Sequence, residues 1–201
     1  METPNLYQFK VSLPEVSPPV WRQIVVPANI PLDRLHDVIQ IVMGWTDSHL
    51  YEFTIGSRHY MEMPEGPEDG EAAGTACLGE VIDEAKGRFV YTYDFGDSWQ
   101  HLVVAEKPGP DADLPFMPVF CLDGKRACPP ENIGGPMGYE AFCEAIKDKK
   151  HPEHLDMKQW YADATGATTP FKPEAFDVDD VNRRLSQYLR WNRPRPLPWI
   201  F

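Results

Sequence analysis

The residues whose types best suit chemistry lie between Tyr91 and Gly135. The first part of this stretch gathers two carboxylates, an indole and an imidazole within eight positions: Asp94, Asp97, Trp99 and His101. Carboxylates and imidazoles can bind metals and transfer protons. No acid, base and nucleophile set with a defined reaction stands out, so the sequence does not decide between an enzyme and a binding protein.

A β-hairpin is predicted to present these side chains. Strand-forming residues precede an Asp-Phe-Gly-Asp turn, in which Asp94 should cap backbone amides and Gly96 should adopt a positive φ. On the returning strand, the period of two places Trp99, His101 and Val103 on one face. The Asp-Phe-Gly tripeptide also occurs at the metal site of protein kinases, but the chain is too short and lacks the other kinase motifs.

Two cysteines follow the hairpin. Cys121 and Cys128 are separated by six residues, a wider gap than in zinc knuckles, so structural thiols are favoured over metal ligands. A nucleophilic Cys128 is a further alternative. Gly134 and Gly135 then precede a predicted helix and resemble an anion-binding helix start, although a tight turn with close backbone packing is favoured.

Hydrophobic periodicity predicts the elements that position this stretch. Apolar alternation indicates strands, and an apolar stripe between Pro31 and Gly44 indicates a helix. The predicted strands cover residues 6–13, 20–26, 50–55 and the hairpin at 88–106. The predicted helices cover 31–43, one turn near 78–82, 138–149, about 153–162, and a last helix capped by Asp177 or Asp179 that ends near Leu189.

The chain of 201 residues is predicted to form a single α+β domain, with helices packed against a mostly antiparallel sheet. Its core should span about residues 5–190. Residues 62–76 are acidic and rich in glycine and proline, which is typical of a mobile loop. Residues 191–201 form a proline-rich tail.

Composition limits the partners and the location. A formal net charge of -12 disfavours broad binding to nucleic acid, because proteins that grip phosphate backbones are usually basic. The sequence begins without a signal peptide and contains no apolar stretch long enough to span a bilayer. With only four cysteines, a cytoplasmic protein with reduced thiols and no membrane partner is expected. A homo-oligomer is possible.

Three groups of motifs together resemble the plasmid pRiA4b ORF-3-like family over about residues 5–190. They are Leu35-His36, Ile39-Gln40, Gly44-Trp45, His49-Leu50 and Phe53; then Tyr91-x-Tyr93-Asp94-Phe95-Gly96-Asp97-x-Trp99-x-His101; then Cys121, Gly124, Cys128-Pro129-Pro130-Glu131, Gly134-Gly135 and Gly138-Tyr139. The resemblance implies a compact mixed α and β domain that occurs on plasmids, mobile elements and chromosomes. It implies no particular activity.

The shared motifs define a candidate pocket: His36, Gln40, Trp45, His49, Asp94, Asp97, Trp99, His101, Glu131, Gly134 and Gly135. They also contain residue types that bind a divalent metal: His36, His49, Asp94, Asp97, His101, Cys121 and Cys128. Many relatives carry a further cysteine near position 133, where this chain has Ile133, and that difference weakens the case for a thiolate-rich zinc site.

Three hypotheses follow. The favoured one is a non-catalytic binding or adaptor domain whose polar pocket is built from the hairpin and the loop around Cys121 and Cys128. The second is a metal-dependent hydrolase or nuclease that uses histidine and aspartate ligands. The third is a nucleic-acid-binding accessory of a mobile element, whose affinity should fall steeply with salt.

Overall fold

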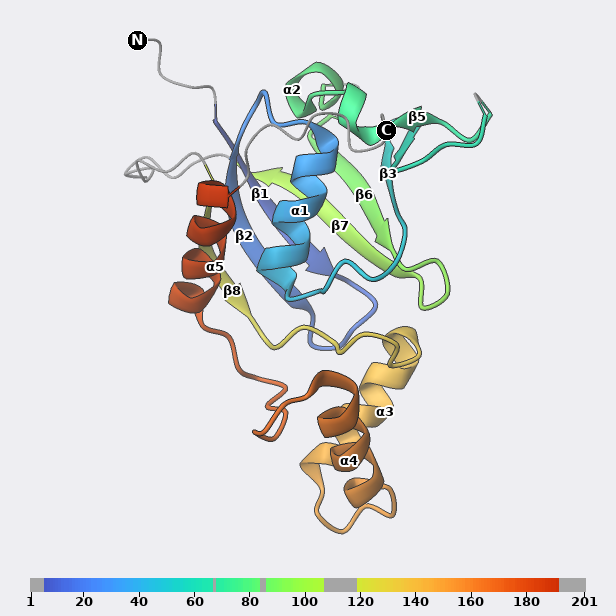
Figure 1. Cartoon of the computed structure of the whole chain (residues 1–201), viewed down its shortest axis with the longest axis vertical. Coiled ribbons are helices and arrows are strands. Elements are labelled where there is room, and N and C mark those ends of the chain that lie inside the picture. The colour runs from blue at the N-terminus through green and yellow to red at the C-terminus, as the bar shows by residue number, and fades with distance from the viewer. Residues whose placement is uncertain (1–5, 67, 84–85, 107–118, 192–201) are drawn as a thin grey trace.

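One mixed sheet organises the chain. A computed structural model describes residues 6–66, 68–83, 86–106 and 119–191 (Figure 1). Eight strands pair in the order β5-β4-β3-β6-β7-β1-β2-β8, and every neighbouring pair is antiparallel except β4 and β5. The strands are β1 (Leu6–Leu13), β2 (Val20–Pro27), β3 (Tyr51–Ile55), β4 (Arg58–Met61), β5 (Glu71–Ala72), β6 (Arg88–Tyr93), β7 (Trp99–Glu106) and β8 (Phe120–Lys125). The predicted α+β class with a mostly antiparallel sheet is confirmed.

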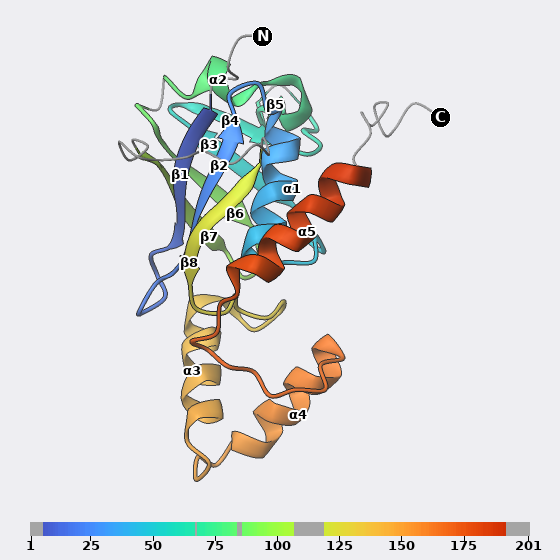
Figure 2. The ribbon, with the colours of Figure 1, turned by 90° about the vertical axis from the view of Figure 1, so that its left-hand side faces the viewer.

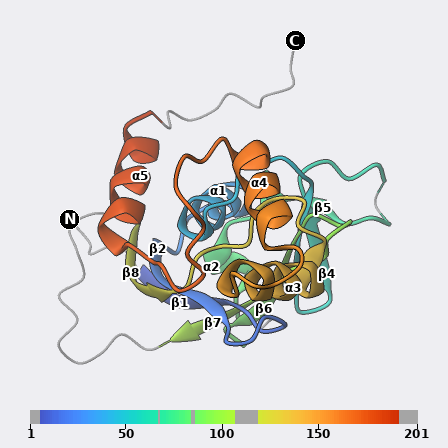
Figure 3. The same ribbon diagram turned by 90° about the horizontal axis from the view of Figure 1, so that it is seen from below.

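Helices cover one face of this sheet and lie at both of its ends (Figure 1 and Figure 2). They are α1 (Leu32–Met43), α2 (Leu78–Val81), α3 (Gly135–Lys147), α4 (His154–Thr165) and α5 (Val178–Trp191), with a short 3₁₀ turn, η1, at Ala73–Thr75. Helices α1 and α5 lie on the same face (Figure 2). Helices α3 and α4 form a pair beyond the end of the strands, and they lie in front of the sheet when it is viewed from that end (Figure 3).

Helix α1 carries the apolar stripe that closes the core. Leu35, Val38, Ile39 and Val42 of the helix are buried in the same core cluster as Phe9 of β1 and Phe53 of β3. Gly44 ends the helix in a left-handed conformation (φ 109°), and its amide donates to the carbonyl of Gln40. The stripe and its glycine stop are therefore confirmed, and they fix the point at which the chain leaves α1.

Several elements differ from the prediction, and β4 was not predicted at all. β8 pairs with β2 at a place where a loop was expected around Cys121, and the register shifts between Gln23 and Ile24. The acidic segment 62–76 was expected to be a loop, but it contains β5 and η1. β5 pairs in parallel with β4 and forms the edge strand of the sheet. Helix α3 starts three residues early, at Gly135, since a proline is tolerated in the first turn, where the amides have no helical partner.

Helix α5 begins where its capping residue predicts. The Asp177 Oδ1 atom accepts hydrogen bonds from the amides of Asp179 and Asp180, both at 3.0 Å. Beyond Trp191 the predicted proline-rich tail lies outside the described residues. Within the described part of the chain, no helix combines the length and apolar character needed to cross a membrane.

Candidate functional site

The β6–β7 hairpin divides its polar residues between the core and the turn. Cross-strand pairing sets Tyr91 opposite His101 and Tyr93 opposite Trp99, and all four residues are buried. In the turn, the Asp94 Oδ1 atom accepts from the amides of Gly96 (2.9 Å) and Asp97 (3.3 Å), as predicted. The two carboxylates therefore stay at the turn, and the indole and imidazole point into the core.

The prediction of a positive φ at Gly96 is wrong. The left-handed residues are Asp94 (φ 55°) and Ser98 (φ 54°), on either side of Gly96. Aspartate tolerates this conformation because its carboxylate can bond to nearby amides, as Asp94 does here. The left-handed residues thus stand at the two ends of the turn, and Gly96 between them does not have a positive φ.

His101 is a neutral residue of the core. Its Nε2 atom accepts a hydrogen bond from Trp45 Nε1 (3.3 Å), and its Nδ1 atom lies 3.2 Å and 3.0 Å from the carbonyl oxygens of Tyr91 and Trp99. This geometry places the proton on Nδ1. Burial lowers the pKa of His101 to about 4. Both ring nitrogens are therefore engaged, and His101 joins Trp45 to the hairpin.

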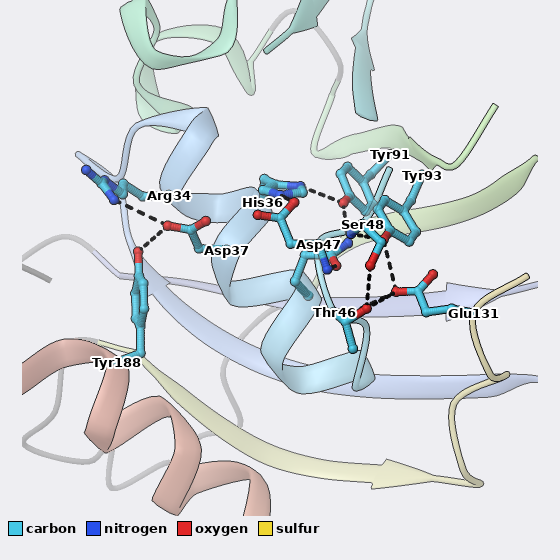
Figure 4. A network of polar contacts seen from close by, with 11 residues as sticks. Arg34, His36, Asp37, Thr46, Asp47, Ser48, Tyr91, Tyr93, Glu131 and Tyr188 are labelled. Atoms are coloured by element: carbon cyan, nitrogen blue, oxygen red, sulfur yellow. Dashed lines mark hydrogen bonds and ion pairs between the residues drawn. The ribbon is translucent and has the colours of Figure 1, made fainter. Parts of the chain in front are cut away.

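His36 lies in a second buried network (Figure 4). Gln40 Nε2 donates to the Tyr91 hydroxyl at 2.9 Å, and His36 Nδ1 lies 2.7 Å from the same oxygen. With Gln40 as donor, the hydroxyl can donate to Nδ1, which leaves the Nε2–H group to donate to Asp47 Oδ1 at 2.9 Å. The Asp47 amide donates in turn to Gln40 Oε1. This closed network fastens the connection between α1 and β3 onto β6.

A third cluster lies nearer the surface, around Glu131. The Glu131 Oε1 atom accepts from the Thr46 amide (2.8 Å), the Thr46 hydroxyl (3.0 Å) and the Tyr93 hydroxyl (3.0 Å). His49 Nε2 lies 3.5 Å from Asp94 Oδ2 and 3.9 Å from Glu131 Oε2. Neither His49 Nε2 nor Glu131 Oε2 makes a hydrogen bond within the described chain, although both atoms lie beneath the surface. Carboxylates and an imidazole thus converge here with unused hydrogen-bonding capacity.

Asp97 connects the hairpin turn to the start of α3. Its Oδ2 atom accepts from the Gly134 amide at 3.0 Å, so the amide at this helix start holds an anion that the chain itself supplies. Gly134 (φ 89°) and Gly135 (φ 70°) both adopt left-handed conformations. A Cβ atom at Gly135 would lie only 2.6 Å from the backbone oxygen of Asp97. The close backbone packing that was predicted for these glycines is present.

We expect Gly135→Ala to lower the free energy of unfolding by roughly 2–3 kcal/mol, because it adds a left-handed alanine to a collision with backbone. Gly134→Ala is the matched control: it is also left-handed, but its nearest atom would lie 3.8 Å away. It should cost only about 1–2 kcal/mol. Urea unfolding of both variants measures the difference. Equal losses would contradict the close approach of Asp97.

The seven predicted metal ligands do not gather at one point. Among the described residues, one group of three brings possible ligand atoms within 4.8 Å of one another, and it consists of His36, Asp37 and Asp47. Only His36 belongs to the predicted set. Asp37 Oδ2 already accepts from Tyr188 (2.7 Å) and pairs with Arg34 (3.3 Å), which links α1 to α5 (Figure 4). The group is thus part of an internal polar network.

The cysteines are protonated thiols. Cys121 is buried in β8, and burial raises its pKa to about 11. Burial also raises the pKa of Cys128, an effect that the nearby Arg22 guanidinium only partly opposes. All four cysteines of the chain are free. These surroundings are the opposite of those that activate a cysteine nucleophile.

Several residues of the polar networks were not predicted. Tyr91 and Tyr93 stand in the recognised motif, and their hydroxyls join the clusters. The available signal was the alternation of β6, which places both tyrosines on its buried face. Thr46 and Asp47 follow Trp45 directly, and an exposed aspartate after a helix stop is typical of many loops. Arg22, buried on β2, carries no local signal.

Three large apolar side chains are exposed beside the Glu131 cluster in sequence. Leu50 follows His49, Phe95 follows Asp94, and Met137 lies in the first turn of α3; they are 51%, 53% and 84% exposed. The Asp94 amide also donates to the Leu50 carbonyl, which joins the two loops. Exposed apolar residues mark an interaction site when they form a contiguous patch, whereas single ones are normal on protein surfaces.

Comparisons with known proteins agree with this architecture. The sequence profile of the plasmid pRiA4b ORF-3-like protein family matches residues 5–180. Uncharacterized protein y4hQ of Sinorhizobium fredii (strain NBRC 101917 / NGR234) is 37% identical over 194 residues, which cover 92% of this chain and 97% of that protein. The crystal structure of MM3350 from Methanosarcina mazei Go1, a protein of unknown function, is similar with a TM-score of 0.73 and 34% identity, covering 89% of this chain and 98% of that one.

Proposed function

The chain belongs to the plasmid pRiA4b ORF-3-like family, and on that premise we propose that it is a non-catalytic binding or adaptor domain. Its ligand would contact a surface that we call the acidic site. This site consists of His49, Asp94, Asp97 and Glu131, and the exposed Leu50, Phe95 and Met137 are near it in sequence. The connection after α1, the hairpin turn and the start of α3 each contribute to it.

The observation that carries this proposal is the unused hydrogen-bonding capacity at His49 Nε2 and Glu131 Oε2. These atoms lie 3.9 Å apart and make no hydrogen bond with the described chain, whereas Glu131 Oε1 accepts three. Buried polar groups in folded proteins are nearly always hydrogen-bonded. A ligand group or a water molecule that bonds to both atoms would complete the network.

The charge of the acidic site favours a cationic ligand. Asp94, Asp97 and Glu131 contribute three carboxylates, and in the described chain none of them pairs with a lysine or arginine. The chain as a whole carries a formal charge of -12. An ammonium or guanidinium group is therefore the chemistry that fits best, and the apolar neighbours would contact the aliphatic part that carries it.

The states of the potential nucleophiles support binding over catalysis. Burial raises the pKa of the Cys121 and Cys128 thiols and of the Tyr91 hydroxyl, so all three stay protonated at neutral pH. His101 is enclosed in the core. A general base at this cluster would have to be His49 or a carboxylate. The hydroxyls that bond to Glu131 Oε1 are those of Thr46 and Tyr93, and both donate to the same oxygen that accepts the Thr46 amide.

Binding can be tested with two mixed peptide libraries that differ only in a central arginine or glutamate, titrated into ¹⁵N-labelled protein. We expect saturable shifts at the acidic site with the arginine library alone, and weaker binding in high salt. Glu131→Gln should weaken binding about tenfold, because it removes the charge but retains the Oε1 acceptor. Glu15→Gln is the control, since it makes the same charge change on an exposed side chain of the β1–β2 connection.

Other outcomes would redirect the proposal. Hydrolysis of a phosphoester or ester panel that His49→Ala abolishes would establish catalysis. Metal retained in stoichiometric amount and lost in His36→Ala or His49→Ala would favour the metal-dependent alternative. Salt-sensitive binding of DNA or RNA, with no response to the arginine library, would favour the nucleic-acid alternative.

A further inference from the structure

A cleft of about 660 Å³ lies away from the acidic site. It is bounded by the connection between β1 and β2, one side of α3 and the segment that leads into α5. Figure 2 shows these three parts of the chain meeting below the sheet. None of the predicted pocket residues lines it. A volume of this size is typical of pockets for small molecules.

The cleft has an apolar interior and one buried charge. Val16, Tyr139 and Phe171 are buried residues of its lining, and Ile146 is half-buried. Of its six charged lining residues, five are exposed, and only Arg126 is buried, at 4% exposure. A charge that is removed from water requires a partner of opposite charge. The position of Arg126 therefore decides which ligand the cleft can accept.

Arg126 uses only part of its hydrogen-bonding capacity. Its Nη1 atom donates to the Pro18 carbonyl, and its Nε atom donates to Glu174 Oε1 at 3.1 Å. No hydrogen bond from Nη2 to the described chain is present. Glu174 contacts the guanidinium through one oxygen, and its own side chain is 67% exposed. A carboxylate that bonded to both Nε and Nη2 would have the bidentate geometry that Glu174 lacks.

We propose that this cleft binds a small apolar acid, whose carboxylate pairs with Arg126 in place of Glu174 and whose apolar body contacts Val16, Ile146 and Phe171. Glu174 then acts as an internal competitor that occupies the guanidinium when no ligand is bound. The exposed position of Glu174 allows it to turn into solvent at little cost. This site is independent of the acidic site, because the two share no lining residue.

Decanoate is a suitable probe, and decanamide is its neutral counterpart. Isothermal titration of the wild-type protein should give saturable binding of decanoate and binding of decanamide that is weaker by about tenfold or more, because a charge-assisted pair is lost. Glu174→Gln should strengthen decanoate binding, since it removes the competing carboxylate. Ile146→Trp should weaken decanoate binding, because the larger indole would occupy part of the apolar space in the cleft. Ile146 is only half-buried, so the fold can accept the larger side chain.

Cys143 supplies a readout of position, because its half-buried thiol lines the cleft. Bound decanoate should slow alkylation of Cys143 by iodoacetamide, measured on its peptide by mass spectrometry, and leave the rate at Cys77 unchanged. Absence of saturable decanoate binding to folded wild-type protein would overturn the proposal. Equal affinity for decanoate and decanamide, or weaker binding in Glu174→Gln, would overturn the role of Arg126.

Discussion

Arg22→Met should lower the free energy of unfolding by about 3–5 kcal/mol, as expected when one member of a buried polar network is removed. Arg22 is 2% exposed, and burial lowers its pKa. Its guanidinium donates to four carbonyl oxygens, those of Trp21, Val42, Lys125 and Arg126, at 2.7–3.0 Å. Methionine fills similar space but leaves these acceptors without a donor.

The position of Val42 explains why the effect should be large. Val42 lies in the last turn of α1, where backbone carbonyls lack helical partners. This last turn contains no basic side chain that could interact with the negative end of the helix dipole. Arg22 on β2 supplies that positive charge and also holds the end of β8. Arg88→Met, on an exposed position of β6, is the control and should change stability by no more than about 0.5 kcal/mol. Guanidinium chloride unfolding measures both, and similar values for the two variants would refute this role.

The second large effect concerns pH. The free energy of unfolding should fall by about 3 kcal/mol from this group alone as pH is lowered from 6.5 to about 4, because the buried His101 resists protonation. An unfolded chain binds a proton at His101 below pH 6.5, whereas the folded chain binds it only near pH 4. Acid therefore favours the unfolded state in this window, and above pH 6.5 the contribution is constant.

The comparison with His101→Gln separates the contribution of His101 from that of the carboxyl groups, which become protonated in an overlapping pH range. Urea unfolding at several pH values between 4 and 7 should show a smaller loss of stability toward acid in the variant than in the wild type. The variant should also be less stable at pH 7, where the fit of the ring against Trp45 is lost. Parallel curves for the two proteins would mean that His101 is protonated in the folded state.

The fold was predictable wherever local signals agree with the tertiary structure. The stripe and Gly44 define α1, Asp177 marks the start of α5, and alternation defines β1 and the hairpin faces. β8 was missed because Asp123, Gly124 and Lys125 are poor strand formers, and its pairing with β2 depends on residues about 100 positions away. β5 has only two residues, too few for any periodicity.

The sequence could select residues for a candidate site but could not indicate how they are arranged. Motif spacing selected His36, His101, His49 and Glu131, but the structure assigns the first two to closed networks and the last two to the acidic site. Glu131 bonds to Thr46, 85 residues earlier, and that contact depends on how α3 meets the hairpin. Arg126 had no signal at all, because a lone arginine is usually exposed.

The strand order has a consequence for how the chain folds during its synthesis. β1 and β2 are adjacent in sequence and near the end of the sheet, but β1 also pairs with β7, with Gln8 opposite Glu106, and β2 pairs with β8. On the ribosome the N-terminal hairpin therefore emerges with both of its edges unpaired. The chain must be made as far as Glu106 before β7 can close the edge of β1, and as far as Lys125 before β8 can close the edge of β2. Such long-range pairing slows folding, and open edges invite association between nascent chains. Lys10, exposed in the middle of β1, places a charge on the hairpin during this interval, when it would otherwise be most prone to pair with another chain.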